Sequence, residues 1–167
     1  EDDSVYFAED AVSTKYKALL EIIEDNPQEK MLILTDSQKF ASIVSSRLIQ
    51  KQGDGSAFEW SGQANQRQRE EAKQEFINGD LKYIVAVIPA IAEGVDGLQD
   101  ACRTVVWLSH SDSNILNQQV LDRVRRRGQK QVVQVYDIVA RDTYDEGQLD
   151  TLVQRELDSR ASLREGQ

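Results

Sequence analysis

Short apolar segments alternate along the chain with longer segments in which apolar residues recur every three or four positions. The short segments are rich in Val, Ile and Leu and are bounded by polar turns: residues 31–35, 57–60, 83–88, 104–108 and 132–139. Continuous apolar runs of this length are typical of parallel strands that are covered on both faces. We therefore expect these segments to form the buried strands of a parallel sheet.

The longer segments predict amphipathic helices between and after the strands. Their ranges and apolar faces are 14–25 (Tyr16, Leu19, Leu20, Ile23), about 40–48 (Phe40, Ile43, Val44, Leu48), 65–79 (Ala72, Phe76), 114–126 (Ile115, Leu116, Val120, Val124) and 144–162 (Leu149, Leu152, Val153, Leu157). Asn65 is suited to cap the third helix, because Gln68 follows three residues later and completes a capping box. Gly79 is expected to end that helix.

This alternation predicts an α/β fold with a doubly wound parallel sheet and right-handed crossovers, in three layers. Ligands of such folds bind at the carboxyl ends of the strands. We expect a single domain over residues 13–163, with a flexible lead-in over residues 1–12 and a short tail over residues 164–167.

Composition narrows the classes of function. Acidic side chains outnumber basic ones by 29 to 20, and a net charge of -9 argues against an autonomous nucleic-acid-binding domain. The apolar runs are too short to span a bilayer, so we expect no membrane association. With one Cys and one His, neither a disulfide framework nor a zinc site can be built. We interpret Cys102 as a core residue and His110 as a loop residue.

One motif is absent. An α/β chain that hydrolyses ATP by itself usually carries a glycine-rich loop that ends in Gly-Lys followed by Ser or Thr. No Gly-Lys pair occurs anywhere in this sequence. The chain therefore lacks the phosphate loop, and we do not expect it to hydrolyse ATP alone.

Residues 118–130 form the most informative segment, because several arginines gather there in an otherwise acidic chain. Arg123 and Arg126 are three positions apart and share one face of a helix. Paired guanidinium groups are suited to bridge phosphate oxygens. The alternative is a solvated basic helix end, which interacts favourably with the helix dipole.

The residues around these arginines resemble motif VI of the Swi/Snf-like branch of superfamily-two helicases and translocases, Gln-x-x-Asp-Arg-x-x-Arg-x-Gly-Gln. The matching positions are Gln119, Asp122, Arg123, Arg126, Gly128 and Gln129. Arg125 stands where the family usually has His, and Arg127 where it usually has Ile.

Other segments resemble further motifs of the same family, in the same order, so that the resemblance covers about residues 13–146. They are residues 13–15 (entry to the lobe), 31–48 (motif IV), Ser61 and Gly62 with Arg69 and Phe76, 92–96 (motif V) and 143–146 (Thr-x-x-Glu). Before motif V, Pro89 to Ile91 occupy the place where the family has a Ser or Thr that contacts phosphate. A phosphate contact there would need backbone amides.

The resemblance implies a C-terminal, RecA-like lobe of the P-loop NTPase type, without its own phosphate loop. In the family, an N-terminal RecA-like lobe of the same protein holds most of the ATP and Mg²⁺. The resemblance implies that Arg123 and Arg126 are the arginine fingers that reach this ATP. It assigns nucleotide contacts to Gln119, Gly94 and Asp96, although Asp96 also suits a helix cap.

For the nucleic acid, which we expect to be double-stranded DNA, the resemblance suggests backbone contacts from Thr35, Ser37, Ser61 and Gly62, at strand ends. These residues would serve equally as helix caps. Trp60 is suited to stack on a base but is better explained as a core or interface residue. An intracellular protein is expected, cytoplasmic in a bacterium or virus and otherwise nuclear.

Two other interpretations remain open on the sequence. The chain could be a catalytically silent RecA-like lobe that serves as a docking module. It could also be an unrelated doubly wound domain that binds a different anion through the arginines at 123–127. The isolated chain would then bind its ligand, whereas a half-site would not.

Overall fold

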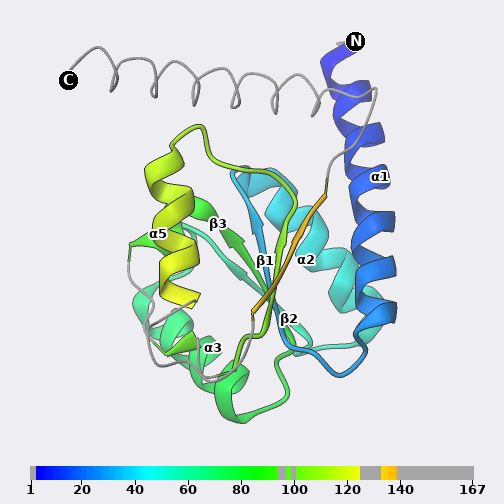
Figure 1. Ribbon diagram of the computed structural model, residues 1–167. Coiled ribbons are helices and arrows are strands. Elements are labelled where there is room, and N and C mark those ends of the chain that lie inside the picture. Colours follow the sequence, from blue (N-terminus) through cyan, green and yellow to red (C-terminus); the bar gives the residue numbers. More distant parts are fainter. Residues whose placement is uncertain (1–2, 94–96, 99–100, 125–132, 139–167) are drawn as a thin grey trace, which may run out of the picture.

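The computed structural model describes residues 3–93, 97–98, 101–124 and 133–138 of the 167-residue chain. Its strands are β1 (Met31–Thr35), β2 (Ala57–Trp60), β3 (Tyr83–Val87), β4 (Thr104–Trp107) and β5 (Gln134–Asp137). They form one sheet in the order β2-β3-β1-β4-β5, and all neighbouring pairs are parallel (Figure 1). The predicted α/β class with a parallel sheet is confirmed.

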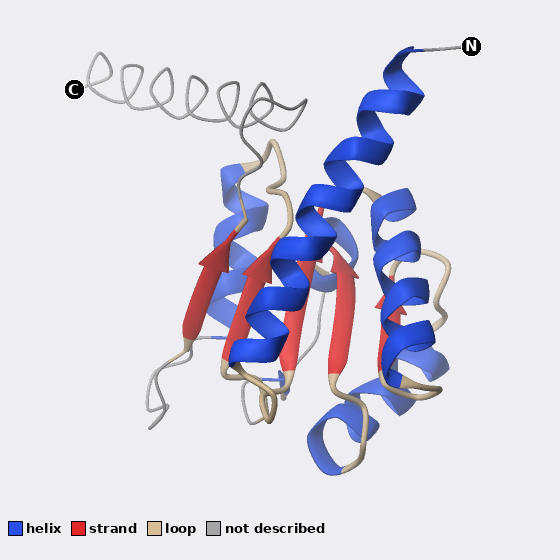
Figure 2. Ribbon diagram, turned by 90° about the vertical axis from the view of Figure 1, so that its right-hand side faces the viewer, coloured by secondary structure: helices blue, strands red, loops and turns tan. Residues whose placement is uncertain are grey.

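Helices cover both faces of this sheet and make three layers (Figure 2). They are α1 (Asp3–Asp25), α2 (Gln38–Gln52), α3 (Gln66–Asn78), α4 (Ile88–Ala92) and α5 (Asn114–Val124). Successive side chains of a strand point to opposite faces. Met31 and Ile33 accordingly pack with α1 and α2, while Leu32 and Leu34 pack with α3, α4 and α5. Strands β1, β3 and β4 are therefore buried on both sides, as their sequences predicted. The prediction of a buried strand is wrong for β5, which is mostly exposed because it lies at the edge of the sheet.

The third predicted helix is confirmed together with its capping box. The Asn65 side chain accepts from the Gln68 amide at 2.8 Å, and the Gln68 side chain accepts from the Asn65 amide at 2.9 Å. Gly79 is the C-cap, where its amide bonds the Glu75 carbonyl. Phe76 is fully buried and packs this helix against the sheet.

The structure differs from the predicted elements at α1 and α4. Helix α1 begins at Asp3, well before the expected start at residue 14. Helix α4 was not predicted, and its first residue, Ile88, was assigned to the preceding strand. Pro is tolerated in the first turn of a helix, where its missing N–H has no intrahelical partner, and Pro89 lies in that turn.

The predicted apolar face of α5 is wrong at one position. Ile115 is 72% exposed, and Asn117, which is 8% exposed, faces the core with Val120 and Val124. Positions 117, 120 and 124 form one stripe at helical spacing, whereas position 115 is two residues away and therefore on the opposite side.

Several sequence predictions fall outside the described residues. These are the helix at 144–162, the domain limit at 163 and the tail at 164–167. In the part of the chain that the structure describes, no helix is both long enough and apolar enough to cross a bilayer.

Candidate functional site

The carboxyl ends of β1 and β4 are joined by a small hydrogen-bond network. The hydroxyls of Thr35 and Ser109 are 2.9 Å apart. Ser109 also donates to the Asp36 carboxylate at 2.9 Å and accepts from the Asp36 amide at 3.1 Å. The network fixes the positions of the two loops where a parallel sheet usually binds its ligands.

This network engages the Thr35 hydroxyl both as a donor and as an acceptor. Ser109 has one hydroxyl proton, and it goes to Asp36, so the Thr35 hydroxyl donates to Ser109. The Thr35 oxygen also accepts from the amide of Ser37 at 3.2 Å, and the residue is fully buried. The Thr35 side chain therefore stabilises the loop, and its proposed contact with nucleic acid would have to come from its backbone.

Ser37 and Ser61 are engaged in similar local bonds. Ser37 caps α2 by accepting from the Phe40 amide at 3.2 Å. Ser61 is fully buried, and its hydroxyl donates to the Glu59 carboxylate at 3.0 Å. Gly62 is exposed, and an added Cβ would meet nothing within 4 Å. Of these positions, the turn at Gly62 and the half-buried start of α2 are accessible from outside.

Arg69 positions the turn that contains Ser61 and Gly62. Its guanidinium donates to the Ser61 carbonyl at 2.7 Å and lies over the ring of Trp60, 5.7 Å from the ring centroid. Trp60 is 3% exposed, which agrees with the expectation of a core or interface tryptophan. Arg67, in contrast, is exposed and pairs with Glu71.

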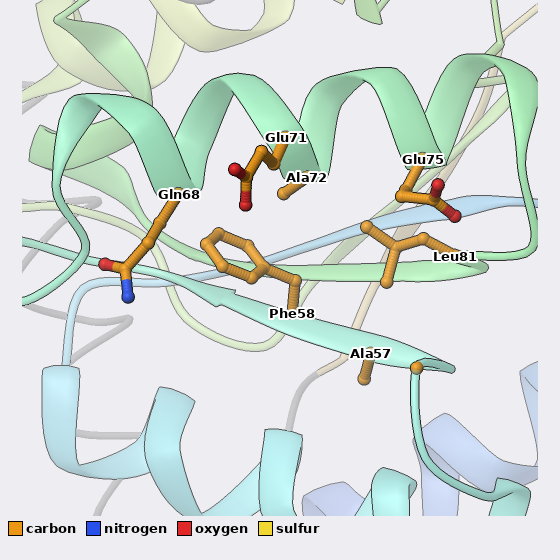
Figure 3. A pocket seen from close by; sticks show the side chains of 8 residues that line it. Ala57, Phe58, Gln68, Glu71, Ala72, Glu75 and Leu81 are labelled. Atoms are coloured by element: carbon orange, nitrogen blue, oxygen red, sulfur yellow. The ribbon is translucent and has the colours of Figure 1, made fainter.

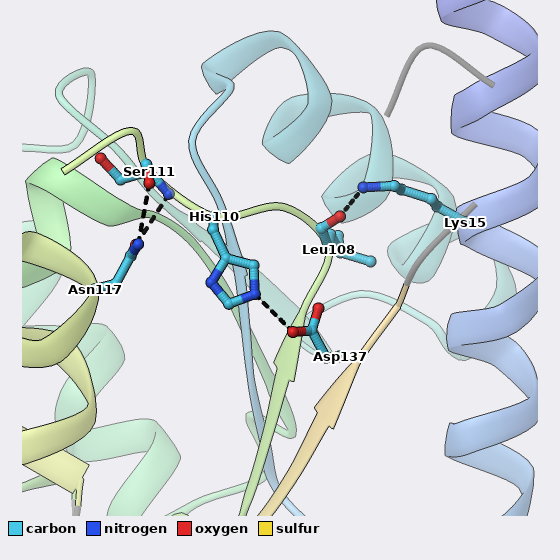
Figure 4. A network of polar contacts seen from close by, with 6 residues as sticks. All are labelled: Lys15, Leu108, His110, Ser111, Asn117 and Asp137. Atoms are coloured by element: carbon cyan, nitrogen blue, oxygen red, sulfur yellow. Dashed lines mark hydrogen bonds and ion pairs between the residues drawn. The ribbon is translucent and has the colours of Figure 1, made fainter. Parts of the chain in front are cut away.

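Two further residues at this edge were missed by the sequence analysis (Figure 4). His110 bonds the carboxylate of Asp137 at 2.8 Å and stacks on Trp107, with ring centroids 4.4 Å apart. Lys15 of α1 is 2% exposed and donates to the Leu108 carbonyl at the end of β4. A buried ammonium is rare without a specific partner. The signal available in the sequence was the Ser-Thr-Lys stretch at the entry to the lobe.

Helix α5 carries Gln119 and Arg123, two of the residues that are predicted to contact the nucleotide. It starts after the loop that follows β4 and runs back along the sheet, away from the carboxyl edge (Figure 1). Its 11 residues extend about 16 Å. Arg123, in the last turn, therefore lies at the far end from Thr35 and Ser37. Arg123 is thus separated by about the length of α5 from the nucleic-acid contacts predicted at Thr35 and Ser37.

The orientation of α5 is set by its buried residues. Val120 and Val124 are 1% and 2% exposed and pack in the core beside α4. Gln119 is exposed and Arg123 is half-buried. Gln119 and Arg123 are four positions apart and share one side of the helix, so a rigidly packed helix presents both of them together.

The remaining predicted site residues, Gly94, Asp96 and Arg126, lie outside the described residues. Within the described ranges, no group of three His, Cys, Asp or Glu side chains is arranged to hold a metal ion.

Comparison with known proteins supports the assignment from the residues. Residues 14–128 match the model of the helicase conserved C-terminal domain. The chain is 25% identical over 144 residues to the DNA repair protein RAD5 of Kluyveromyces lactis and 30% identical over 141 residues to that of Cryptococcus neoformans. The alignments cover 82% and 80% of this chain but 13% and 11% of those proteins.

Solved structures share the fold. One is the C-terminal part of the Fun30 ATPase domain, with a TM-score of 0.68 and 22% identity. The match covers 80% of this chain and 43% of the Fun30 chain. Another is the Sulfolobus solfataricus SWI2/SNF2 ATPase core in complex with double-stranded DNA, with a TM-score of 0.63 and 22% identity. The match covers 84% of this chain and 29% of the SWI2/SNF2 chain. The resemblance predicted from the motifs is confirmed.

Proposed function

Because the chain belongs to the family of helicase conserved C-terminal domains, we propose that it is the second motor lobe of an ATP-dependent nucleic-acid helicase or translocase. The observation that carries this proposal is the presentation of Gln119 and Arg123 on one side of α5. Buried Val120 and Val124 hold the helix in place, and the motif continues to Arg126. Because the helix is already packed, its guanidinium can meet an anion on a second lobe without any ordering of the backbone.

The proposed site is one half of a nucleotide site. The chain has no phosphate loop, so ATP and Mg²⁺ would be held mainly by an N-terminal RecA-like lobe. A bound Mg·ATP supplies the phosphoryl group whose transfer releases the energy. Arg123 and Arg126 would stabilise the charge that develops on this group. Gln119 would orient the nucleotide, with Gly94 nearby and Asp96 accepting from a ribose hydroxyl.

The nucleic acid would cross the carboxyl edge of the sheet. Ser37 begins α2, which has no acidic residue in its first turn, and Lys39 is exposed beside it. The amides at a helix start favour a phosphate group. The Gly62 turn would add backbone amides, while Thr35 and Ser61 would hold the two loops in shape. Such contacts follow the backbone without reading the base sequence.

Double-stranded DNA is the substrate we propose. The RAD5 relatives are DNA repair proteins, and the SWI2/SNF2 core that shares the fold is in complex with double-stranded DNA. The proposal implies a protein that works inside the cell, in the nucleus where the source has one.

The test is a DNA-stimulated ATPase assay on the protein in which this chain is joined to its N-terminal lobe. Arg123→Ala and Arg126→Ala are each expected to lower turnover by roughly 10³ to 10⁵, as for other arginine fingers, while nucleotide affinity changes far less. Arg67→Ala is the matched control, because Arg67 is 88% exposed and lies on another helix. Its turnover should be unchanged.

Near-normal turnover in both finger variants would refute the proposed roles. A wild-type protein that binds DNA but shows no ATPase activity would instead support the catalytically silent docking module. DNA affinity would be measured in the same preparations, and Lys39→Ala is expected to weaken it without removing nucleotide binding, because it removes the exposed cation beside the start of α2.

A further inference from the structure

A cavity of about 270 Å³ opens between the edge strand β2 and helix α3, on the side of the molecule where the sheet ends (Figure 3). Its floor is apolar and consists of Ala57, Phe58, Ala72 and Leu81. Phe58 points toward the helix and is only half-buried, while Leu81 and Ala72 are 5% and 6% exposed. An apolar surface is thus left accessible at the edge of the sheet.

The rim of this cavity is acidic. Gln68, Glu71 and Glu75 follow one another along one side of α3 and reach over the floor (Figure 3). Glu71 pairs with Arg67 at 3.1 Å, but both side chains are well exposed, so the pair is weak. Glu75 makes no ion pair with any described residue. The rim therefore favours a cationic group above an apolar floor.

The backbone beside the cavity is also open. Strand β2 pairs with β3 and has no other strand neighbour in the described part of the chain. The Ser56 carbonyl accepts from the Tyr83 amide at 3.0 Å, so it faces β3. Backbone groups alternate in direction along a strand, so those of Ala57 and Glu59 face outward. Ala57 is 8% exposed and Glu59 is half-buried, and no described strand pairs with their outward-facing groups.

Size and charge limit what can occupy this place. Pockets for small molecules and cofactors usually measure about 300 to 1,000 Å³, so this one suits one or two side chains of a peptide. A second copy of the chain is disfavoured, because each copy has a net charge of -9 and the same acidic rim.

We propose that the open edge of β2 is a docking site for an extended, basic peptide segment of a partner protein. The segment adds a strand beside Ala57 and Glu59, as in other cases of β-strand addition. Its alternate side chains point to the cavity, where an apolar one covers Phe58 and a Lys or Arg two positions away, on the same face of the added strand, meets Glu71 and Glu75. This site is independent of the proposed ATP and DNA contacts.

The experiment is an NMR titration of the whole chain with a short, capped synthetic peptide in which Thr occupies every second position and Val and Lys take turns at the positions between, so that one face of the strand carries both Val and Lys. The amide signals of Ala57 and Glu59 are expected to shift and to become protected from hydrogen exchange. Added salt should weaken binding, because both partners are charged and solvent-exposed. An otherwise identical peptide with Glu in place of each Lys should not bind.

Two charge-reversal variants of α3 distinguish binding at the cavity from attraction to the overall charge of the protein. Glu75→Lys is expected to lower the affinity for the peptide by about fivefold, because an exposed attractive charge pair is replaced by a repulsive one. Glu70→Lys makes the same change in net charge on the same helix, but Glu70 does not line the cavity. It should leave binding nearly unchanged.

Three results would overturn the proposal. The first is a set of shifts that avoids β2, and the second is an equal loss of binding in the two variants, which would indicate attraction to overall charge. The third is a shift of the same β2 amides on concentrating the chain alone, which would identify a second copy as the occupant.

Discussion

Asn117 of α5 and Ser111 of the loop after β4 exchange two hydrogen bonds (Figure 4). The Ser111 amide donates to the Asn117 side chain at 2.9 Å, and the Asn117 side chain donates to the Ser111 carbonyl at 3.0 Å. Both residues are buried, so the pair satisfies backbone groups that water cannot reach. It also fixes how the helix that carries Gln119 and Arg123 leaves the sheet.

Asn117→Ala is expected to lower the free energy of unfolding by about 2 to 4 kcal/mol, because it leaves a buried donor and a buried acceptor without partners. Urea denaturation would measure the loss. Gln118→Ala, at the exposed neighbouring position, should change stability by no more than about 0.5 kcal/mol. A similar small effect for both variants would contradict the role given to Asn117.

The core contribution of Phe76 can be tested against exposed Ile115. Phe76 is fully buried, and Phe76→Ala should cost about 3 to 5 kcal/mol because it leaves a cavity between α3 and the sheet. Ile115→Ala removes a large apolar side chain that is 72% exposed, so its cost should stay within about 0.5 kcal/mol. Thermal and urea unfolding of the two variants would decide whether Ile115 really lies outside the core.

The capping box of α3 gives a third prediction. Asn65→Ala removes the acceptor for the Gln68 amide and should destabilise the protein by about 1 kcal/mol. Gln66→Ala, at the exposed first position of the helix, provides the comparison. If both variants had the same midpoint in urea, the cap would contribute nothing measurable.

Cys102 makes stability depend on pH in the alkaline range. Burial raises the pKa of its thiol from an ordinary value of 9.0 to about 12. Above pH 9 the unfolded chain loses this proton while the folded chain keeps it, so stability falls as the pH rises toward 12. Between pH 9 and 10 the loss should be about 1 kcal/mol.

The measurement compares the wild-type protein with Cys102→Ala over that pH interval. Burial also raises the pKa of Tyr16 and Tyr83, and both proteins share that contribution. The difference in unfolding free energy between the two proteins should therefore narrow as the pH rises. A difference that stays constant would show that the thiol ionises alike in the folded and unfolded chains.

Local patterns predicted the elements that local forces specify. The Asn65 cap, the Gly79 helix end and the bounds of β1 and β2 were all correct. Helix α4 was missed, because a Pro in the first turn of a short helix looks the same in sequence as a Pro in a loop. Ile115 was assigned to the core because apolar character alone does not say which side of a helix meets the sheet.

The sequence by itself determined the class of fold, the absence of a phosphate loop and the family, because these follow from periodicity and from ordered motifs. Tertiary structure alone decided that the Thr35 hydroxyl is hydrogen-bonded to Ser109 and that Lys15 is buried against the end of β4. It also decided that Arg123 lies about a helix length from the carboxyl edge of the sheet, where Ser37 is found. The physical reason is distance along the chain. These relationships involve residues from separate strands and helices, and only the packing of the sheet sets the distances between them.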